Sequence, residues 1–179
     1  YAHAKEDEHT RAFVVRLMTD LVDRSTSERL REIAAKDQSG LVRLSLASAL
    51  QKLPVKERFD IAEALVSHAA DAHDPWQPLM IWYGVSDCVP FDAEKSVAIA
   101  GKSKIPLVRE FIIRRVMQDG GPGRDAAAGL VASTKGSDRI SVLRGMVEGL
   151  KGIRRTDAPA GWSNVVSEVE GDKDSESLQ

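Results

Sequence analysis

The sequence predicts an all-α protein of the α-solenoid class, a right-handed superhelix of about five stacked helix pairs. Aromatic residues make up only 5% of the chain, whereas alanine and leucine are abundant, and this mix suits helices better than a β-sandwich. An apolar stripe at positions i, i+3, i+4 and i+7 recurs along the chain. The stripe returns every roughly 30–36 residues, a period typical of helical repeat proteins. An irregular helical bundle is the rival interpretation.

The clearest copies of the stripe follow an arginine. "TRAFVVRLMTDL" contains Arg11 and "VRLSLASALQKL" contains Arg43, which lies 32 residues later. "VREFIIRRVMQD" repeats the pattern after Arg109, and "VLRGMVEGLKG" with Arg144 is a weaker copy. The segment that starts at Pro78, "PLMIWYGVSDCV", has an apolar residue in place of the arginine. We expect the stripe to be buried at Leu46, Ala47, Leu50, Ile112, Ile113 and Val116.

Shorter helices are expected between these copies, beginning at Glu28, Val55, Asp92, Gly123 and Trp162. Asp92 is a candidate N-cap, Pro106 suits the first turn of a helix, and "GGPG" marks a break. Neither type of helix buries its stripe alone, so stacking of pairs is required. The predicted organisation is a helical repeat domain over residues 1–170, incomplete at both ends, followed by an acidic polar tail over 171–179.

An aspartate stands six residues before the arginine in two copies. The pairs are Asp37 with Arg43 and Asp138 with Arg144. This spacing resembles that of HEAT repeats. The resemblance implies that the aspartate caps its own helix while the arginine reaches the turn of the neighbouring repeat, forming a structural ladder. Arg11 and Arg109 lack the aspartate, so we expect the ladder to be broken there.

The stretch "SHAADAHDPWQPLMIWYG" has the residue types of a metal site in His68, Asp71, His73 and Asp74. On one continuous helix the two histidines would lie about 140° apart around the axis, so they would not share a face. A joint between two packed helices explains the same residues without an ion, with an aspartate in the turn and a proline opening the next helix. We therefore predict no metal site.

Aromatic residues in the same stretch have two interpretations. Leu79, Trp82 and Tyr83 follow helical spacing, so we expect them to form a core stripe rather than a ligand box. Trp76 lies off that face and is the better candidate for an exposed contact. The expected partner surface consists of Trp76, Arg109, Arg114 and Arg115.

Composition gives no support for catalysis or for a membrane span. The formal net charge is −2, too little basic charge for a nucleic-acid footprint. Cys88 is the only cysteine, so it forms no disulfide framework, and we expect a buried, inert thiol. No apolar run approaches the ~20 residues that cross a bilayer. No nucleophile–base pair emerges, so no catalytic, cofactor-binding or metal-binding residue is predicted, and no cofactor is expected in this chain.

Three segments in order, "DPWQPLMIWYG", "SKIPLVREFIIRR" and "DAPAGWSNVV", resemble the helical region of large multidomain proteins of planctomycetes and related bacteria. Those proteins are described as membrane-bound dehydrogenase-type or haem-binding. The resemblance implies a parent with a β-propeller similar to sugar dehydrogenases before the repeats, a c-type haem domain with CxxCH after them, and an exported setting. This chain has neither domain, so none of the family's cofactor-binding residues is carried over.

The leading functional hypothesis is therefore a non-catalytic scaffold that contacts a protein partner or neighbouring domains. A nucleic-acid enzyme of the HEAT-like DNA glycosylase kind is the alternative, and a lyase of the HEAT-like bilin type is a third, without diagnostic residues. The helix at Trp162 has an apolar side at Val165, Val166 and Val169 that only one neighbour would cover. We expect self-association through a terminal helix and a parent that continues beyond Gln179.

Overall fold

The computed structural model describes residues 7–20 and 24–171, and this part of the chain contains helices and loops but no strand. The predicted all-α class is thereby confirmed. The elements are α1 (Glu8–Thr19), α2 (Arg24–Lys36), α3 (Gly40–Leu50), α4 (Val55–Val66), the 3-10 helix η1 (Ala69–His73), α5 (Gln77–Val85), α6 (Cys88–Phe91), α7 (Ala93–Lys102), α8 (Pro106–Asp119), α9 (Pro122–Ser133), α10 (Gly136–Leu150) and α11 (Trp162–Gly171). From residue 172 on, the predicted acidic tail lies outside the described residues.

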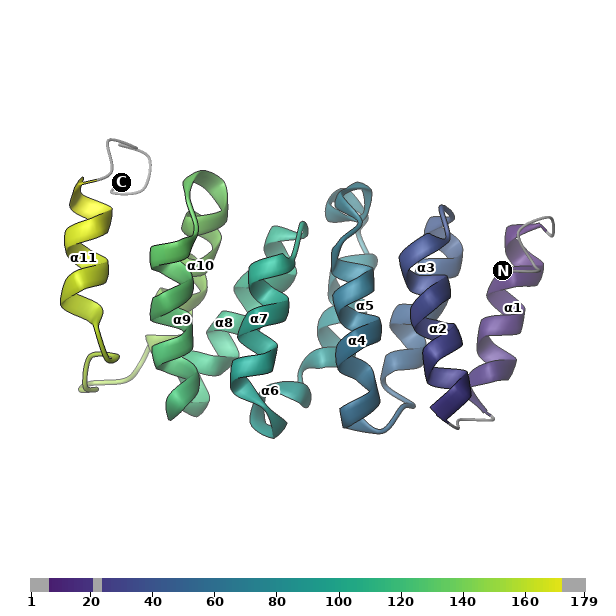
Figure 1. Cartoon of the computed structure of the whole chain (residues 1–179), viewed down its shortest axis with the longest axis horizontal. Coiled ribbons are helices and arrows are strands. Elements are labelled where there is room, and N and C mark those ends of the chain that lie inside the picture. The colour runs from purple at the N-terminus through teal and green to yellow at the C-terminus, as the bar shows by residue number, and fades with distance from the viewer. Residues whose placement is uncertain (1–6, 21–23, 172–179) are drawn as a thin grey trace.

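The long helices alternate between two layers (Figure 1). The first layer contains α2, α4, α7, α9 and α11, and the second contains α1, α3, α5, α8 and α10. Each helix packs against the next member of its own layer, and α1 and α11 lie at opposite ends of the row (Figure 1). Within the second layer, α8 and α10 are the closest neighbours, whereas α5 and α8 make the least contact.

Local chemistry accounts for where the helices begin and end. The side chain of Asp7 accepts hydrogen bonds from the backbone N–H groups of His9 and Thr10, both at 3.0 Å, and so caps α1. Asp92 caps α7 through the N–H of Lys95 at 2.9 Å, as the sequence predicts. Between α8 and α9, Gly120 and Gly121 have φ angles of 80° and 69°, in the left-handed region that favours glycine. The predicted break in "GGPG" is therefore confirmed.

The apolar stripes meet between the layers. All six residues that the sequence assigns to this core are fully buried, so that prediction is confirmed (Leu46, Ala47, Leu50, Ile112, Ile113 and Val116). Two glycines explain why α10 approaches α8 so closely. A Cβ added at Gly145 would lie 2.6 Å from the carbonyl oxygen of Glu110, and one at Gly149 would lie 2.5 Å from that of Arg114. Only hydrogen side chains allow the two backbones to touch there.

Candidate binding surface

Arginines of the second layer reach carboxylates that precede the next helix of the same layer. Arg11 donates to both oxygens of Asp37, at 2.8 and 3.0 Å. Arg43 donates to both oxygens of Asp71, at 2.6 and 2.5 Å, and both residues are 4% exposed. Hydrogen bonding to Asp71 raises the pKa of the Arg43 guanidinium, and burial opposes that rise. These bidentate pairs tie successive helices of the layer together.

The ladder has a different register from the one the sequence predicts. Arg109 contacts Asp138 at 2.7 Å, so the breaks expected at Arg11 and Arg109 are wrong. The sequence predicts that Arg144 is the ladder arginine of α10, but Arg144 is exposed. Arg139 is the arginine buried in α10, where it is 2% exposed and donates to the backbone carbonyl of the preceding turn. The register differs because Asp138 already lies inside α10, which begins at Gly136, whereas Asp37 precedes α3, which begins at Gly40.

Gln77 occupies the arginine position in α5. It follows Asp71 by six residues, as Arg43 follows Asp37. Its Nε2 donates to the carbonyl oxygen of Gly40 at 2.8 Å, whereas its buried Oε1 has no hydrogen-bond partner. Because a neutral amide forms no ion pair, the ladder of arginine–aspartate pairs is interrupted at Gln77.

The histidine-rich stretch forms the predicted joint between α4 and α5, with η1 between them. Asp71 is held by Arg43, and Nε2 of His68 lies 2.7 Å from the carbonyl oxygen of Ala34. Asp74 accepts hydrogen bonds from the backbone N–H groups of Trp76 and Gln77, both at 2.8 Å, at the start of α5. Each of these side chains has a structural partner. Among the described residues, no group of three or more His, Cys, Asp or Glu side chains has the arrangement of a metal site.

The core stripe predicted for α5 is wrong for Tyr83, whereas Trp82 packs partly against the core. The buried residues of this helix are Gln77, Pro78, Ile81, Gly84 and Val85. Tyr83 is 52% exposed, and Leu79 and Trp82 are half-buried. The helix is short and almost entirely apolar, so periodicity selects no face of it.

The displaced side chains line an open groove between α5 and α8, which we call the aromatic groove. Its lining residues are Leu79, Trp82, Tyr83, Phe111, Arg114, Arg115 and Gln118, and its volume is about 300 Å³. The rings of Trp82 and Phe111 pack with centroids 5.6 Å apart and planes tilted by 47°. These two large side chains stand between the helices where the second layer is least tightly packed, so a hollow remains on the exposed side.

The aromatic groove carries one uncommitted cation. Arg114 is exposed and makes no ion pair with the described part of the chain, whereas Arg115 binds Asp119 at 2.9 and 3.0 Å. Of the expected partner surface, Arg114 and Arg115 therefore lie in this groove. Trp76 is 64% exposed but lies outside it. Arg109 is 1% exposed within the ladder, so its assignment to a partner surface is wrong.

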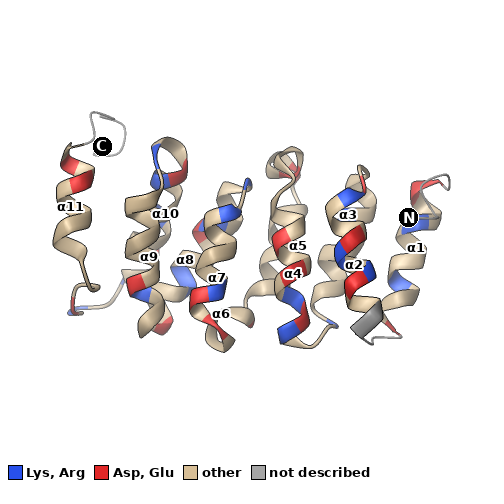
Figure 2. Cartoon of the chain, in the orientation of Figure 1, with Lys and Arg blue, Asp and Glu red and all other residues tan. Residues whose placement is uncertain are grey.

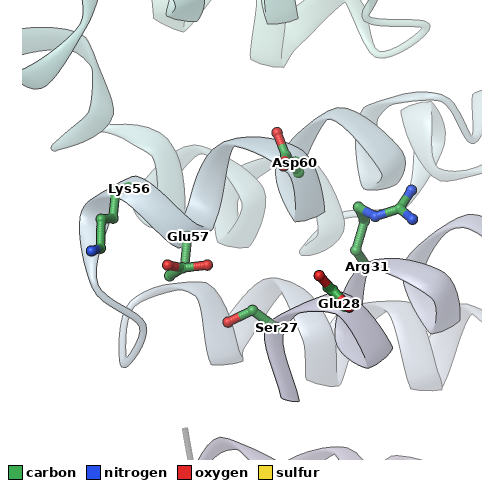
Figure 3. A pocket seen from close by; sticks show the side chains of 6 residues that line it. All are labelled: Ser27, Glu28, Arg31, Lys56, Glu57 and Asp60. Atoms are coloured by element: carbon green, nitrogen blue, oxygen red, sulfur yellow. The ribbon is translucent and has the colours of Figure 1, made fainter. Parts of the chain in front are cut away.

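A second hollow lies between α2 and α4 of the first layer. Six residues line about 330 Å³ of it, namely Ser27, Glu28, Arg31, Lys56, Glu57 and Asp60. Figure 3 shows Glu57 of α4 pointing toward Ser27 and Glu28 of α2. Acidic and basic residues alternate over both helices (Figure 2). Mixed charges of this kind are well hydrated and are depleted from the centres of interfaces, so this hollow is the weaker candidate.

A third hollow lies beside α11. Trp162, Val165, Val166, Val169 and Glu170 line it together with Val131 and Leu143, and its volume is about 230 Å³. Val165 and Val169 are 6% and 9% exposed, which agrees with one covered side of this helix. Self-association through this flank stays a prediction.

Comparisons with protein-family models, with curated proteins and with solved structures give no match. In the part of the chain that the structure describes, no helix is both long enough and apolar enough to cross a lipid bilayer. The aromatic groove combines the exposed ring of Tyr83 and the half-buried rings of Trp82 and Phe111 with an arginine that makes no ion pair among the described residues. We take it as the candidate binding surface.

Proposed function

We propose that this chain is a HEAT-like α-solenoid that acts as a non-catalytic scaffold and binds a protein partner, or neighbouring domains, through its second layer. The alternation of two helical layers supports the solenoid. Arginine–aspartate pairs at Asp37, Asp71 and Asp138 support it further, because they link successive repeats in the manner expected of the family. A stack of this kind presents a long surface in which each repeat contacts only its neighbours.

The aromatic groove is the single observation that carries the proposal. Tyr83 exposes half of its surface, and Trp82 and Phe111 remain partly open beside it. Large aromatic side chains with an arginine are the composition of energetically dominant positions in protein interfaces. Exposed apolar groups gathered in one hollow favour a bound partner over bulk water.

A nucleic-acid enzyme of the DNA glycosylase kind has less support. Arg109 is 1% exposed, and Arg115 is neutralised by Asp119, so two of the three arginines that favoured it are committed. The formal net charge of −2 opposes a phosphate chain as well.

The proposed setting follows from the resemblance alone. A planctomycete-type exported redox protein would use this scaffold to hold its dehydrogenase-like and haem domains apart. The chain itself would then contribute no residue to the cofactor, and its role would be contact and spacing.

Selection of short random peptides displayed on phage, with the immobilised chain as target, tests the proposal. We expect enriched peptides whose binding falls at least fivefold in Tyr83→Ala, because that ring forms one wall of the groove. Trp76→Ala is the matched control, since it removes an exposed aromatic ring, 64% accessible, outside the groove. Enrichment of no peptide, or equal loss in both variants, would reject a partner-binding role for this surface.

A further inference from the structure

The aromatic groove has an apolar floor and a charged edge. Leu79, Trp82 and Phe111 supply the apolar lining, and all three are half-buried. A volume of about 300 Å³ is at the small end of ligand pockets. A hollow of this size fits one or two side chains of a partner rather than a large cofactor.

The charge at its edge is a single open arginine. Arg114 is exposed and makes no ion pair with the described residues, so all five of its N–H donors are available. Arg115 already donates to Asp119 at 2.9 and 3.0 Å, so its charge is largely cancelled. A planar guanidinium with no internal partner matches a carboxylate in a bidentate geometry. Gln118 adds an amide that both donates and accepts.

We infer that the aromatic groove holds an acidic segment of a protein partner, with one aromatic or long aliphatic side chain on Trp82 and Phe111 and one carboxylate against Arg114. The inference rests on the proposed function and names the chemistry of the partner. Complementary charge gives such a contact its specificity, and the apolar side chain gives it most of its affinity. The aromatic rings of the groove could also stack on a base of a single-stranded nucleic acid. Binding of its phosphate chain requires several cations, however, and this groove offers one that is not paired.

Fluorescence anisotropy with four labelled probes tests the inference on the full chain. The first probe is a synthetic peptide that alternates aspartate or glutamate with phenylalanine and leucine. In the second, lysine replaces each acid, and in the third, serine replaces each acid. The fourth is a single-stranded oligothymidine of similar length. We expect the acidic peptide to bind at least tenfold more tightly than the lysine peptide, and its affinity to fall as salt is added.

Reversal of one charge sharpens the test. Arg114→Glu should weaken the acidic peptide about tenfold and strengthen the lysine peptide, because the sign of the contact is inverted. Arg16→Glu is the matched control, since Arg16 is exposed on α1 and gives the same change in net charge away from the groove. Circular dichroism of both variants checks that they fold, and both positions are exposed, so we expect wild-type melting curves.

Each outcome separates the two proposals. Equal binding of the serine and acidic peptides, both lost in Tyr83→Ala, would keep the protein-binding role and overturn the acidic partner. Binding of the oligothymidine alone would overturn both. If Arg16→Glu lowered the affinity for the acidic peptide as much as Arg114→Glu, the effect would come from the net charge of the chain, and the role of Arg114 would be overturned. Self-association that depends on concentration in light scattering and is abolished by Tyr83→Ala would identify a second copy of the chain as the occupant. That result would overturn the acidic partner.

Discussion

Removal of the Asp71 carboxylate measures the cost of leaving one buried arginine of the ladder without its partner. In Asp71→Ala, the guanidinium of Arg43 loses both short bonds, at 2.6 and 2.5 Å, and keeps one to the carbonyl oxygen of Asp37 at 2.9 Å. Both side chains are 5% exposed, so water does not replace the lost partner. Breaking a buried ion pair from one side costs about 3–5 kcal/mol, because an uncompensated charge remains in the core. We expect the free energy of unfolding to fall by that amount.

Asp138→Ala is the matched control, with the same change in charge at another rung. The Asp138 side chain is 54% exposed, and its partner Arg109 keeps the hydroxyl of Ser141 at 2.9 Å and the carbonyl of Ala100 at 3.0 Å. Solvent screening and these remaining acceptors limit the expected loss to about 0–1 kcal/mol.

Urea unfolding at neutral pH, followed by far-ultraviolet circular dichroism, measures both losses. A loss below about 1 kcal/mol in Asp71→Ala, or equal losses in the two variants, would refute the prediction that Asp71 compensates the buried charge of Arg43. The double variant Arg43→Met, Asp71→Leu adds a further check. It should recover most of the stability, since replacing a whole buried pair by apolar residues is often neutral.

Three further predictions concern packing, ionisation and the end of the stack. Gly145→Ala should destabilise the chain by about 1–3 kcal/mol in the same urea titration, because the new methyl group meets the α8 backbone. Gly129→Ala is the control, since its methyl group meets nothing within 4 Å and should stabilise the chain by roughly 0.5–1 kcal/mol. The reverse order of stabilities would contradict the close approach of α8 and α10. Burial raises the pKa of the Cys88 thiol from 9.0 to about 11. As the pH rises, the unfolded chain therefore loses this proton before the folded chain does, and the free energy of unfolding should fall between pH 9.0 and about 11. Cys88→Ala should lack this contribution to the decline. A thiol that reacts with a disulfide reagent in the folded chain at pH 8 as fast as in urea would contradict its burial. Val166→Asp should abolish concentration-dependent association in light scattering, and a wild-type chain that stays monomeric at high concentration would dismiss the α11 flank as a contact.

Sequence reasoning identified the long helices and their buried stripe because both depend on local periodicity. Leu50 and Ile112 lie in segments where apolar residues recur on one face, and such segments have one low-energy way to pack. The arginines were visible for the same reason. Their partners were not, because Asp37 and Asp71 lie before the next helix of the layer whereas Asp138 lies inside it, so the spacing differs from repeat to repeat. Asp71 looked like a turn residue or a metal ligand, and only the fold places it against Arg43.

The candidate site was not predictable from spacing. In α5 almost every side chain is apolar, so the spacing of apolar residues does not predict that Tyr83 is exposed. The error at Arg144 has a similar cause, since the spacing from Asp138 matched the motif although Arg139 fills the buried slot.

The missing rung at Gln77 has a mechanical consequence. Buried ion pairs join α1 to the segment before α3 and α3 to the segment before α5, and Arg109 joins α8 to α10, but in the described part of the chain no buried ion pair joins α5 to the segment before α8. The exposed pairs of Lys95 with Asp60 and Lys102 with Glu63 cross that junction on the first layer only. Under tension applied along the row, we therefore expect the junction between α5 and α8 to yield before the junctions that carry a buried arginine–aspartate pair. The chain would then extend first at this junction, and the aromatic groove would widen as it does so.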